Sequence, residues 1–133
     1  MIFLDTNIFI RYFEQEDEKK AMDVEKLFER LVDGQVSCFT NSIVIAEIVW
    51  TLEKYYEWKK EEVCENIEMI LNTPNIRIAG RNIIKNAIST YKDTNIDYID
   101  SYNHAYIKAH NASQIYSYDT HYDRHEDIER LAP

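Results

Sequence analysis

Acidic residues stand at two points of the chain where a carboxylate could take part in chemistry. Asp5 directly follows the apolar run Ile2–Leu4, and Asp119 directly follows the run Ile115–Tyr118. Each run predicts a short strand, and ligands bind an open parallel sheet in the crevice beyond the carboxyl ends of its strands. We therefore expect both carboxylates to face the same rim. The alternative for each residue alone is an aspartate that caps a helix or closes a turn.

Glu47 is the third candidate, and it lies in a strongly apolar segment, residues 43–56, that predicts a helix. Helical spacing stacks Ile43, Glu47 and Trp50 on one face. A carboxylate flanked by apolar residues is costly to bury unless something binds it, which favours a functional role. The alternative is a narrow solvated stripe that Glu47 shares with Lys54.

Asp97 and Asp100 belong to the segment Asn-Ile-Asp-Tyr-Ile-Asp-Ser-Tyr. Asp97 suits the N-cap of a helix over residues 97–110, where its side chain would accept backbone N–H groups. Asp100 then falls in the first turn, where the helix macrodipole favours any acid. The functional interpretation is that this helix start directs Asp100 toward the same rim.

Carboxylates that converge on one site repel one another and cannot all stay ionised without cations. Mg²⁺ and Mn²⁺ prefer hard oxygen ligands. One or two such ions can activate water, bind a phosphate oxygen and stabilise a leaving oxygen. The sequence therefore predicts a site for Mg²⁺ or Mn²⁺ formed by Asp5, Glu47, Asp100 and Asp119, with phosphodiester hydrolysis as its chemistry.

Short apolar runs alternate with helical patterns along the whole chain. Strands are expected at 2–4, 36–39, 76–78, 115–118 and 128–131, and helices from residue 5 onward and at 21–32, 43–56, 59–71, 81–91 and 97–110. This alternation predicts an α/β fold, a three-layer α/β/α sandwich with a short parallel sheet.

Length and composition favour one globular domain that spans residues 1–133. Apolar residues make up 45% of the chain, and only two glycines and two prolines occur, so helices should dominate over long loops. Cys38 and Cys64 form no metal-type pair and fit a reducing compartment. Without a signal peptide or a bilayer-spanning run, we expect a soluble cytoplasmic protein that does not contact a membrane.

The net charge of −9 argues against a broad nucleic-acid surface that depends on phosphate neutralisation alone. It leaves open an enzyme that binds phosphate through metal ions, because the carboxylates that hold those ions add to the negative charge.

The four acidic segments, taken in order, resemble the four motifs of PIN domains, and specifically those of the VapC-type toxin ribonucleases. Phe-Leu-Asp-Thr-Asn-Ile-Phe-Ile resembles the first motif, with Asp5 as a metal ligand oriented by Asn7. Ala-Glu-Ile-Val-Trp resembles the second, with Glu47. Ile-Asp-Tyr-Ile-Asp-Ser-Tyr resembles the third, with Asp100, and Ser-Tyr-Asp-Thr-His-Tyr resembles the fourth, with Asp119.

Two motifs depart from the usual pattern of the family. Ser101, Tyr102 and Asn103 follow Asp100 where small residues are usual, and Ser117 and Tyr118 precede Asp119 where Thr-Phe is usual. Ser117 keeps a hydroxyl group. The resemblance implies that four further residues support the ligands, namely Thr6, Asn7, Asp97 and Ser117.

The resemblance also implies a PIN-like fold and a metal-dependent endoribonuclease that leaves a 3′-hydroxyl and a 5′-phosphate. It implies an RNA substrate, a homodimer and a small antitoxin protein as the partner. Two alternatives stay open, a structure-specific DNA or RNA nuclease of the same superfamily and an inactive PIN fold that serves as a protein-binding module.

Other residues carry weaker signals. His104 shares a helix face with Asp100, and His121 and His125 are spaced for one helix face, although no further pair completes a zinc site. A stripe of tyrosines could stack on bases or simply pack. It comprises Tyr98, Tyr102 and Tyr106. Isolated basic residues are candidates for phosphate contacts, although most such residues are merely solvated. They are Arg11, Lys54, Lys92 and Arg124.

Overall fold

A computed structural model describes all residues, 1–133, and shows a mixed α/β fold with short parallel strands. The chain divides into two compact units, Met1–Arg81 (unit 1) and Asn82–Pro133 (unit 2). All five predicted strands are present, and every pairing is parallel, with three strands in one sheet and two in another. The α/β class with short parallel strands is therefore confirmed.

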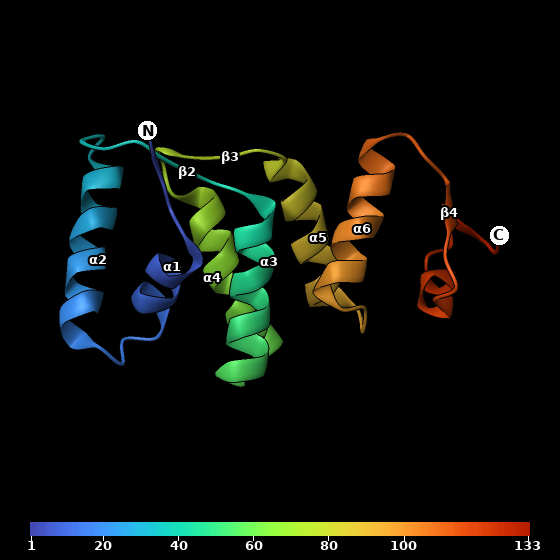
Figure 1. The fold of residues 1–133 in the computed structure, drawn as a ribbon, viewed down its shortest axis with the longest axis horizontal. Helices are drawn as coiled ribbons and strands as arrows, with labels where there is room; N and C mark the ends of the chain where they lie inside the picture. The colour runs from blue at the N-terminus through green and yellow to red at the C-terminus, as the bar shows by residue number, and fades with distance from the viewer. The chain divides into compact units, whose positions relative to one another are not determined.

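The sheet of unit 1 has the order β1-β2-β3, and its three strands lie side by side in Figure 1. The strands are β1 (Ile2–Phe3), β2 (Cys38–Thr40) and β3 (Ile76–Ile78). Alternate residues of β2 and β3 are buried, so one face of the sheet packs on the core. The hydroxyl of Thr40 donates to the carbonyl of Leu4 at 2.9 Å, which fixes the chain just after β1 against β2.

The helices of unit 1 form the core below this sheet. They are α1 (Thr6–Phe13), α2 (Glu18–Val32), α3 (Ser42–Trp50) and α4 (Lys60–Asn72). Helix α1 packs against both α2 and α3. Phe9, Leu31 and Ile48 are fully buried at these contacts. Helix α2 begins three residues earlier than expected because the Asp17 side chain accepts the N–H of Lys20 and caps it.

The prediction of one regular helix over residues 43–56 was wrong in its second half. The α-helical turns end at Trp50, and a π-helical turn, η1 (Thr51–Tyr55), follows. There the N–H of Tyr56 donates to the carbonyl of Thr51 at 3.1 Å, which is the wider bonding pattern of a π-helix. The apolar pattern of this segment could not reveal the change, because both helix types keep Leu52 buried.

Unit 2 contains two helices, two parallel strands and a short 3₁₀ helix. They are α5 (Arg81–Asp93, whose first residue ends unit 1), α6 (Tyr98–Ala109), β4 (Gln114–Tyr116), η2 (Thr120–Arg124) and β5 (Glu129–Leu131). Strands β4 and β5 pair with each other. Helices α5 and α6 run side by side in opposite directions in Figure 1.

Strand β4 ends two residues earlier than expected, at Tyr116, so Asp119 does not follow the strand directly. The N–H of Ser117 still donates to the carbonyl of Leu131 at 3.1 Å, and its carbonyl accepts a hydrogen bond from the Arg130 guanidinium at 3.1 Å. Asp119 instead caps the 3₁₀ helix η2, an element that the polar sequence after His121 did not predict. The structure contains no helix with both the length and the apolar character needed to cross a lipid bilayer.

Candidate active site

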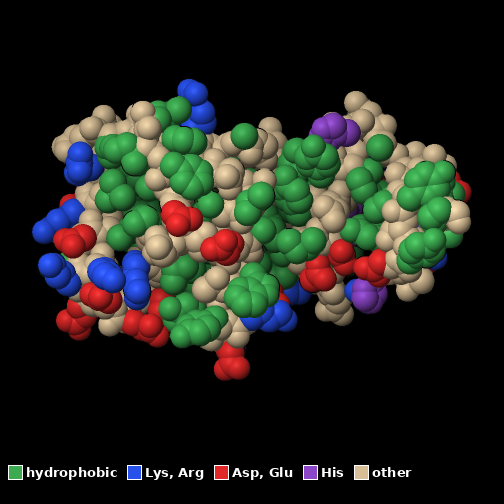
Figure 2. Space-filling model, viewed as in Figure 1, with side chains coloured by type: hydrophobic (Ala, Val, Ile, Leu, Met, Phe, Trp, Pro, Cys, Tyr) green, Lys and Arg blue, Asp and Glu red, His purple; other side chains and the backbone are tan.

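Asp100, Asp119 and His121 come together in unit 2. One possible ligand atom from each lies within 4.8 Å of the others. Oδ1 of Asp119 is 3.1 Å from Nδ1 of His121. Figure 2 shows acidic side chains and a histidine gathered at the start of α6. Two of the four predicted ligands therefore lie close together, accompanied by a histidine to which the sequence analysis gave no place in this site.

The start of α6 places Asp100 through a conventional cap. The Asp97 side chain accepts the backbone N–H of Asp100 at 2.9 Å, as expected for an N-cap residue. Asp100 then stands in the first helical turn, half-buried. Burial, followed by the negative charges of Asp97 and Asp119, raises the pKa of Asp100 above its usual range. Excess negative charge of this kind is what a divalent cation would relieve.

Tyr122 and Asn103 form a support behind Asp100. The Asn103 amide donates to the Tyr122 hydroxyl at 2.9 Å, and this hydroxyl interacts with the Asp100 carboxylate and lowers its pKa in part. Tyr122 is buried, and its burial raises the pKa of its phenol, so it stays a neutral hydrogen-bond donor. Sequence reasoning noted Asn103 only as a departure from the family. Its spacing of three residues from Asp100 on one helix was the available signal.

Asp119 is held at the start of η2. Its own N–H donates to the Ser117 hydroxyl at 3.0 Å, and its Oδ1 accepts the N–H of His121 at 2.9 Å. These contacts and the His121 ring contact all use Oδ1 or the backbone, so Oδ2 remains available to a ligand. Ser117 thus contacts the backbone of Asp119 through its hydroxyl.

Asp5 is exposed and caps α1. Its Oδ1 accepts the backbone N–H of Thr6 at 2.8 Å, so the capping alternative describes part of its role. The Thr6 hydroxyl is buried and has no hydrogen-bond partner. Asn7 is exposed beside them. One carboxylate oxygen of Asp5 therefore serves the helix, and the other does not take part in the cap.

Glu47 is exposed, which overturns the argument from costly burial. Ile43 and Trp50, its neighbours on the helix face, are 72% and 62% exposed. The solvated alternative fits this exposure, because Lys54 is exposed as well, although Lys54 pairs with Glu53 at 3.2 Å and not with Glu47. The π-helical turn after Trp50 changes the phase of the helix, so residue 54 no longer follows the α-helical spacing from residue 47. Glu47 is an accessible carboxylate on α3, which packs against α1.

Comparison with known proteins identifies the family of this chain. The profile of the PIN domain matches residues 2–128. The chain belongs to the PIN domain family. A VapC ribonuclease of Aquifex aeolicus (strain VF5) is 31% identical to this PIN domain over 100 residues, which cover 75% of the chain and 73% of that protein. The expected membership of the PIN domain family is thereby confirmed.

A solved structure is also similar to this PIN domain over nearly its whole length. It is the crystal structure of VapBC2 from Rickettsia felis bound to a DNA fragment from their promoter. The identity is 18%, the match covers 99% of this chain and 98% of that chain, and the TM-score is 0.39.

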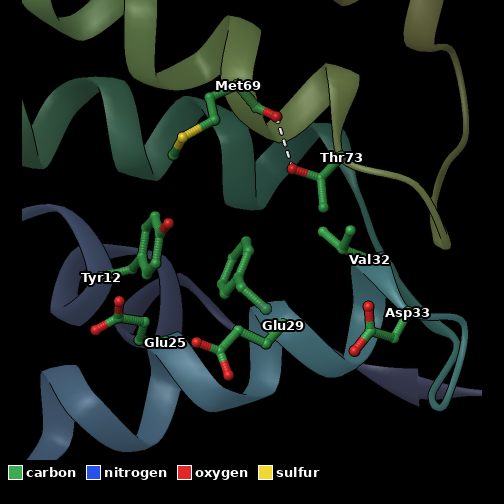
Figure 3. Close-up of a pocket in the computed structure, with 8 residues that line it drawn as sticks. Tyr12, Glu25, Glu29, Val32, Asp33, Met69 and Thr73 are labelled. Atoms are coloured by element: carbon green, nitrogen blue, oxygen red, sulfur yellow. Dashed lines mark hydrogen bonds between the residues drawn. The ribbon is translucent and has the colours of Figure 1, made fainter.

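A separate cavity of about 450 Å³ lies in unit 1 of the PIN domain. Figure 3 shows Tyr12 of α1 and Met69 of α4 facing each other across it. Glu25, Glu29 and Asp33 follow one another along α2 at its edge. Three carboxylates at helical spacing repel phosphate, so this cavity is a poor place for an RNA backbone.

The weaker signals of the sequence have different outcomes in the PIN domain. Tyr98 is buried, and Tyr106 at the other end of the tyrosine stripe is 46% exposed, so packing accounts for only part of the stripe. Arg124 donates to the carbonyl of Asn95 at 3.4 Å. His121 and His125 do not form a pair, since His121 contacts Asp119 and the ring of His125 stacks on His104.

Proposed function

We propose that this chain is a divalent-metal-dependent endoribonuclease and acts as the toxin of a toxin–antitoxin pair. The observation that carries the proposal is the cluster of Asp100, Asp119 and His121 in a chain of the PIN domain family. The similarity to a VapC ribonuclease supports RNA as the substrate. The proposed ligands of Mg²⁺ or Mn²⁺ are Asp5, Glu47, Asp100 and Asp119.

The donor set fits a hard divalent cation. All four proposed ligands offer carboxylate oxygen, and burial, followed by the negative charges of Asp97 and Asp119, raises the pKa of Asp100. When bound, Mg²⁺ or Mn²⁺ supplies charge neutralisation on the phosphate and activation of water. The reaction adds a water oxygen to phosphorus and breaks the bond to O3′, leaving a 3′-hydroxyl and a 5′-phosphate.

The residues around the carboxylates would hold them in place during this reaction. The N–H of Thr6 holds one oxygen of Asp5, and the hydroxyl of Ser117 accepts the N–H of Asp119. Asp97 fixes the first turn that carries Asp100, and the Tyr122 hydroxyl fixes its carboxylate. We propose Asn7, exposed beside Asp5, as a further orienting residue. Such partners keep ligands in one orientation and so reduce the reorganisation that binding requires.

We further propose a small antitoxin protein as the partner, a homodimer as the working state and the cytoplasm as the place of action. The name of the solved relative, VapBC2, gives the precedent for a toxin–antitoxin complex. The two alternative functions are a structure-specific DNA or RNA nuclease and an inactive protein-binding module.

Incubation of the purified chain with single-stranded RNA, structured RNA and DNA separates these functions. We expect cleavage of RNA with Mg²⁺ or Mn²⁺, none with EDTA, and products with 5′-phosphate ends. Cleavage of branched DNA in preference to RNA would support the structure-specific nuclease. Cleavage that persists in EDTA with 2′,3′-cyclic ends would refute the metal-dependent mechanism, and an absence of cleavage with every substrate would favour the binding module.

A further inference from the structure

A second group of possible ligands lies in unit 2 and comprises His104, His125 and Asp127. One possible ligand atom from each residue lies within 4.8 Å of the others. His104 belongs to α6, His125 ends the 3₁₀ helix η2, and Asp127 stands before β5. Nε2 of His104 and Oδ1 of Asp127 are 2.8 Å apart.

A buried nitrogen in this group has no partner. His125 is 7% exposed, and its Nε2 makes no hydrogen bond. Buried polar atoms are nearly always paired, so a lone one calls for an explanation. Burial, together with the charge of His104, lowers the pKa of His125, which keeps its ring neutral at neutral pH. A neutral imidazole is the form that binds metals.

Asp127 carries the negative charge that such a site needs. The hydrogen bond from His104 lowers the pKa of Asp127, so its carboxylate is ionised. The ammonium group of Lys108 lies 3.4 Å from Oδ2 of Asp127. A bound cation would compete with this ammonium group for the carboxylate.

The ring geometry shows what binding requires. The rings of His104 and His125 are stacked 3.9 Å apart with an interplanar angle of 8°. A metal ion binds in the plane of an imidazole, so two parallel stacked rings cannot both bind it until one turns. His104 has the space to turn, because it lines a cavity of about 450 Å³ together with Lys108 and Asp127. The buried ring of His125 would stay in place.

We propose that His104, His125 and Asp127 form a binding site for a borderline transition-metal cation, for which Zn²⁺ is the probe. Two imidazoles and one carboxylate suit Zn²⁺, with water as a fourth ligand. The site differs in donor chemistry from the all-oxygen ligand set proposed for the nuclease. Its existence does not depend on the nuclease function.

A cation here would stabilise one part of the fold. His104 lies on the helix that carries Asp100, and His125 ends the short helix that Asp119 caps. Binding would therefore tie α6 to the segment between β4 and β5. We expect Zn²⁺ to raise the melting temperature and to restrict the movement of Asp100 relative to Asp119.

The test uses the full chain with Asp119→Asn, which weakens any competing cation site at Asp100. After EDTA treatment and removal of the chelator, Zn²⁺ is titrated in equilibrium dialysis, and melting curves are recorded. We expect about one Zn²⁺ per chain and a rise in melting temperature. Adding His104→Gln or Asp127→Asn should weaken Zn²⁺ binding at least about tenfold, since even outer-shell partners have effects of this size. His110→Gln is the matched control, because His110 is an exposed histidine just after the same helix.

Two results would overturn the proposal. One is an absence of Zn²⁺ uptake by the Asp119→Asn protein at micromolar concentration. The other is uptake that His104→Gln and Asp127→Asn leave unchanged. Both variants change side chains that retain solvent exposure, 18% for His104 and 45% for Asp127, so neither should prevent folding. No readout involves RNA cleavage, so failure here leaves the proposed nuclease untouched.

Discussion

Oδ1 of Asp119 accepts the backbone N–H of His121 and also lies 3.1 Å from Nδ1 of the His121 ring. His121 thus contacts the same oxygen twice, and Oδ2 takes part in neither contact. Asp119, a proposed metal ligand, and His121, which contacts one of its oxygens, are therefore neighbours in both the chain and the fold.

This relation predicts unequal effects of two substitutions. Asp119→Asn should reduce metal-dependent RNA cleavage by more than about a hundredfold, because a direct ligand should matter more than an outer-shell partner, whose loss costs 10–100-fold. His121→Gln should reduce it by about tenfold, because the backbone N–H still holds Oδ1. Initial cleavage rates over a range of Mn²⁺ concentrations measure both effects. Equal losses in the two variants would make His121 a ligand in its own right.

Asp100→Asn tests the cost of ionising Asp100 at its half-buried position beside Asp97 and Asp119. Burial and the charges of Asp97 and Asp119 raise the pKa of Asp100 above its usual value of 3.8. The folded state then holds this proton more tightly than the unfolded chain, so ionisation of Asp100 disfavours folding. This loss of folding free energy is absent below pH 3.8 and grows between pH 3.8 and the raised pKa of Asp100. It is complete at higher pH.

Without metal, Asp100→Asn should therefore be at least as stable as the wild type at neutral pH, and the difference should shrink near about pH 3. Urea unfolding in EDTA at both pH values measures this. Asp23→Asn, an exposed aspartate on α2, is the control. A variant that is less stable than the wild type by the same amount at both pH values would show that ionising Asp100 does not disfavour folding.

Tyr122→Phe removes the hydroxyl that Asp100 and Asn103 share. The variant should lose about 1 kcal/mol of folding free energy, since it leaves the Asn103 amide without this acceptor. Metal affinity should fall about tenfold because Asp100 loses an orienting partner. Thermal melts and Mn²⁺ titrations measure the two effects. Tyr118→Phe is the control, because Tyr118 is 78% exposed, and it should change neither quantity.

Glu47→Gln should separate function from stability. Glu47 is exposed, so the substitution should change the free energy of unfolding by no more than about 0.5 kcal/mol. The wild type should gain roughly 1–3 kcal/mol when Mn²⁺ exceeds its dissociation constant ten- to a hundredfold, and the variant should gain much less. RNA cleavage by Glu47→Gln should also be weaker than that by the wild type. Glu65→Gln on α4 is the control and should keep both the full stabilisation by Mn²⁺ and full RNA cleavage. If Glu47→Gln also keeps both, Glu47 does not belong to the site.

The proposed homodimer is tested by mass. Light scattering at micromolar concentration should give about twice the chain mass of 15.9 kDa. The large exposed apolar side chains, such as Trp50 at 62%, are a reason to expect association, since wide apolar surfaces are uncommon on monomers. A single-chain mass at every concentration would count against it.

The sequence predicted most elements of the fold because their apolar spacing was regular and their caps were local. Residues 76–78 form the expected strand, and Asp97 caps the expected helix. The π-helical turn could not be predicted, and the sequence could not decide between a buried and a solvated Glu47, because both depend on which neighbours pack against α3. His104 and His125 are far apart in the chain, so only the fold could reveal their contact.

The π-helical turn at Thr51–Tyr55 has a bearing on how the chain tolerates insertions and deletions. A π-helical turn holds one residue more than the α-helical turn it replaces, so it is the form that a single-residue insertion takes inside a helix. Removing one residue between 51 and 55 should therefore restore an ordinary α-helix instead of breaking it. Everything before Trp50, Glu47 included, would keep its place, and the side chains after the turn would keep their faces, because an α-helical turn spans the same rotation with one residue fewer. Sequence alignments of this segment should accordingly allow a one-residue gap just after Trp50.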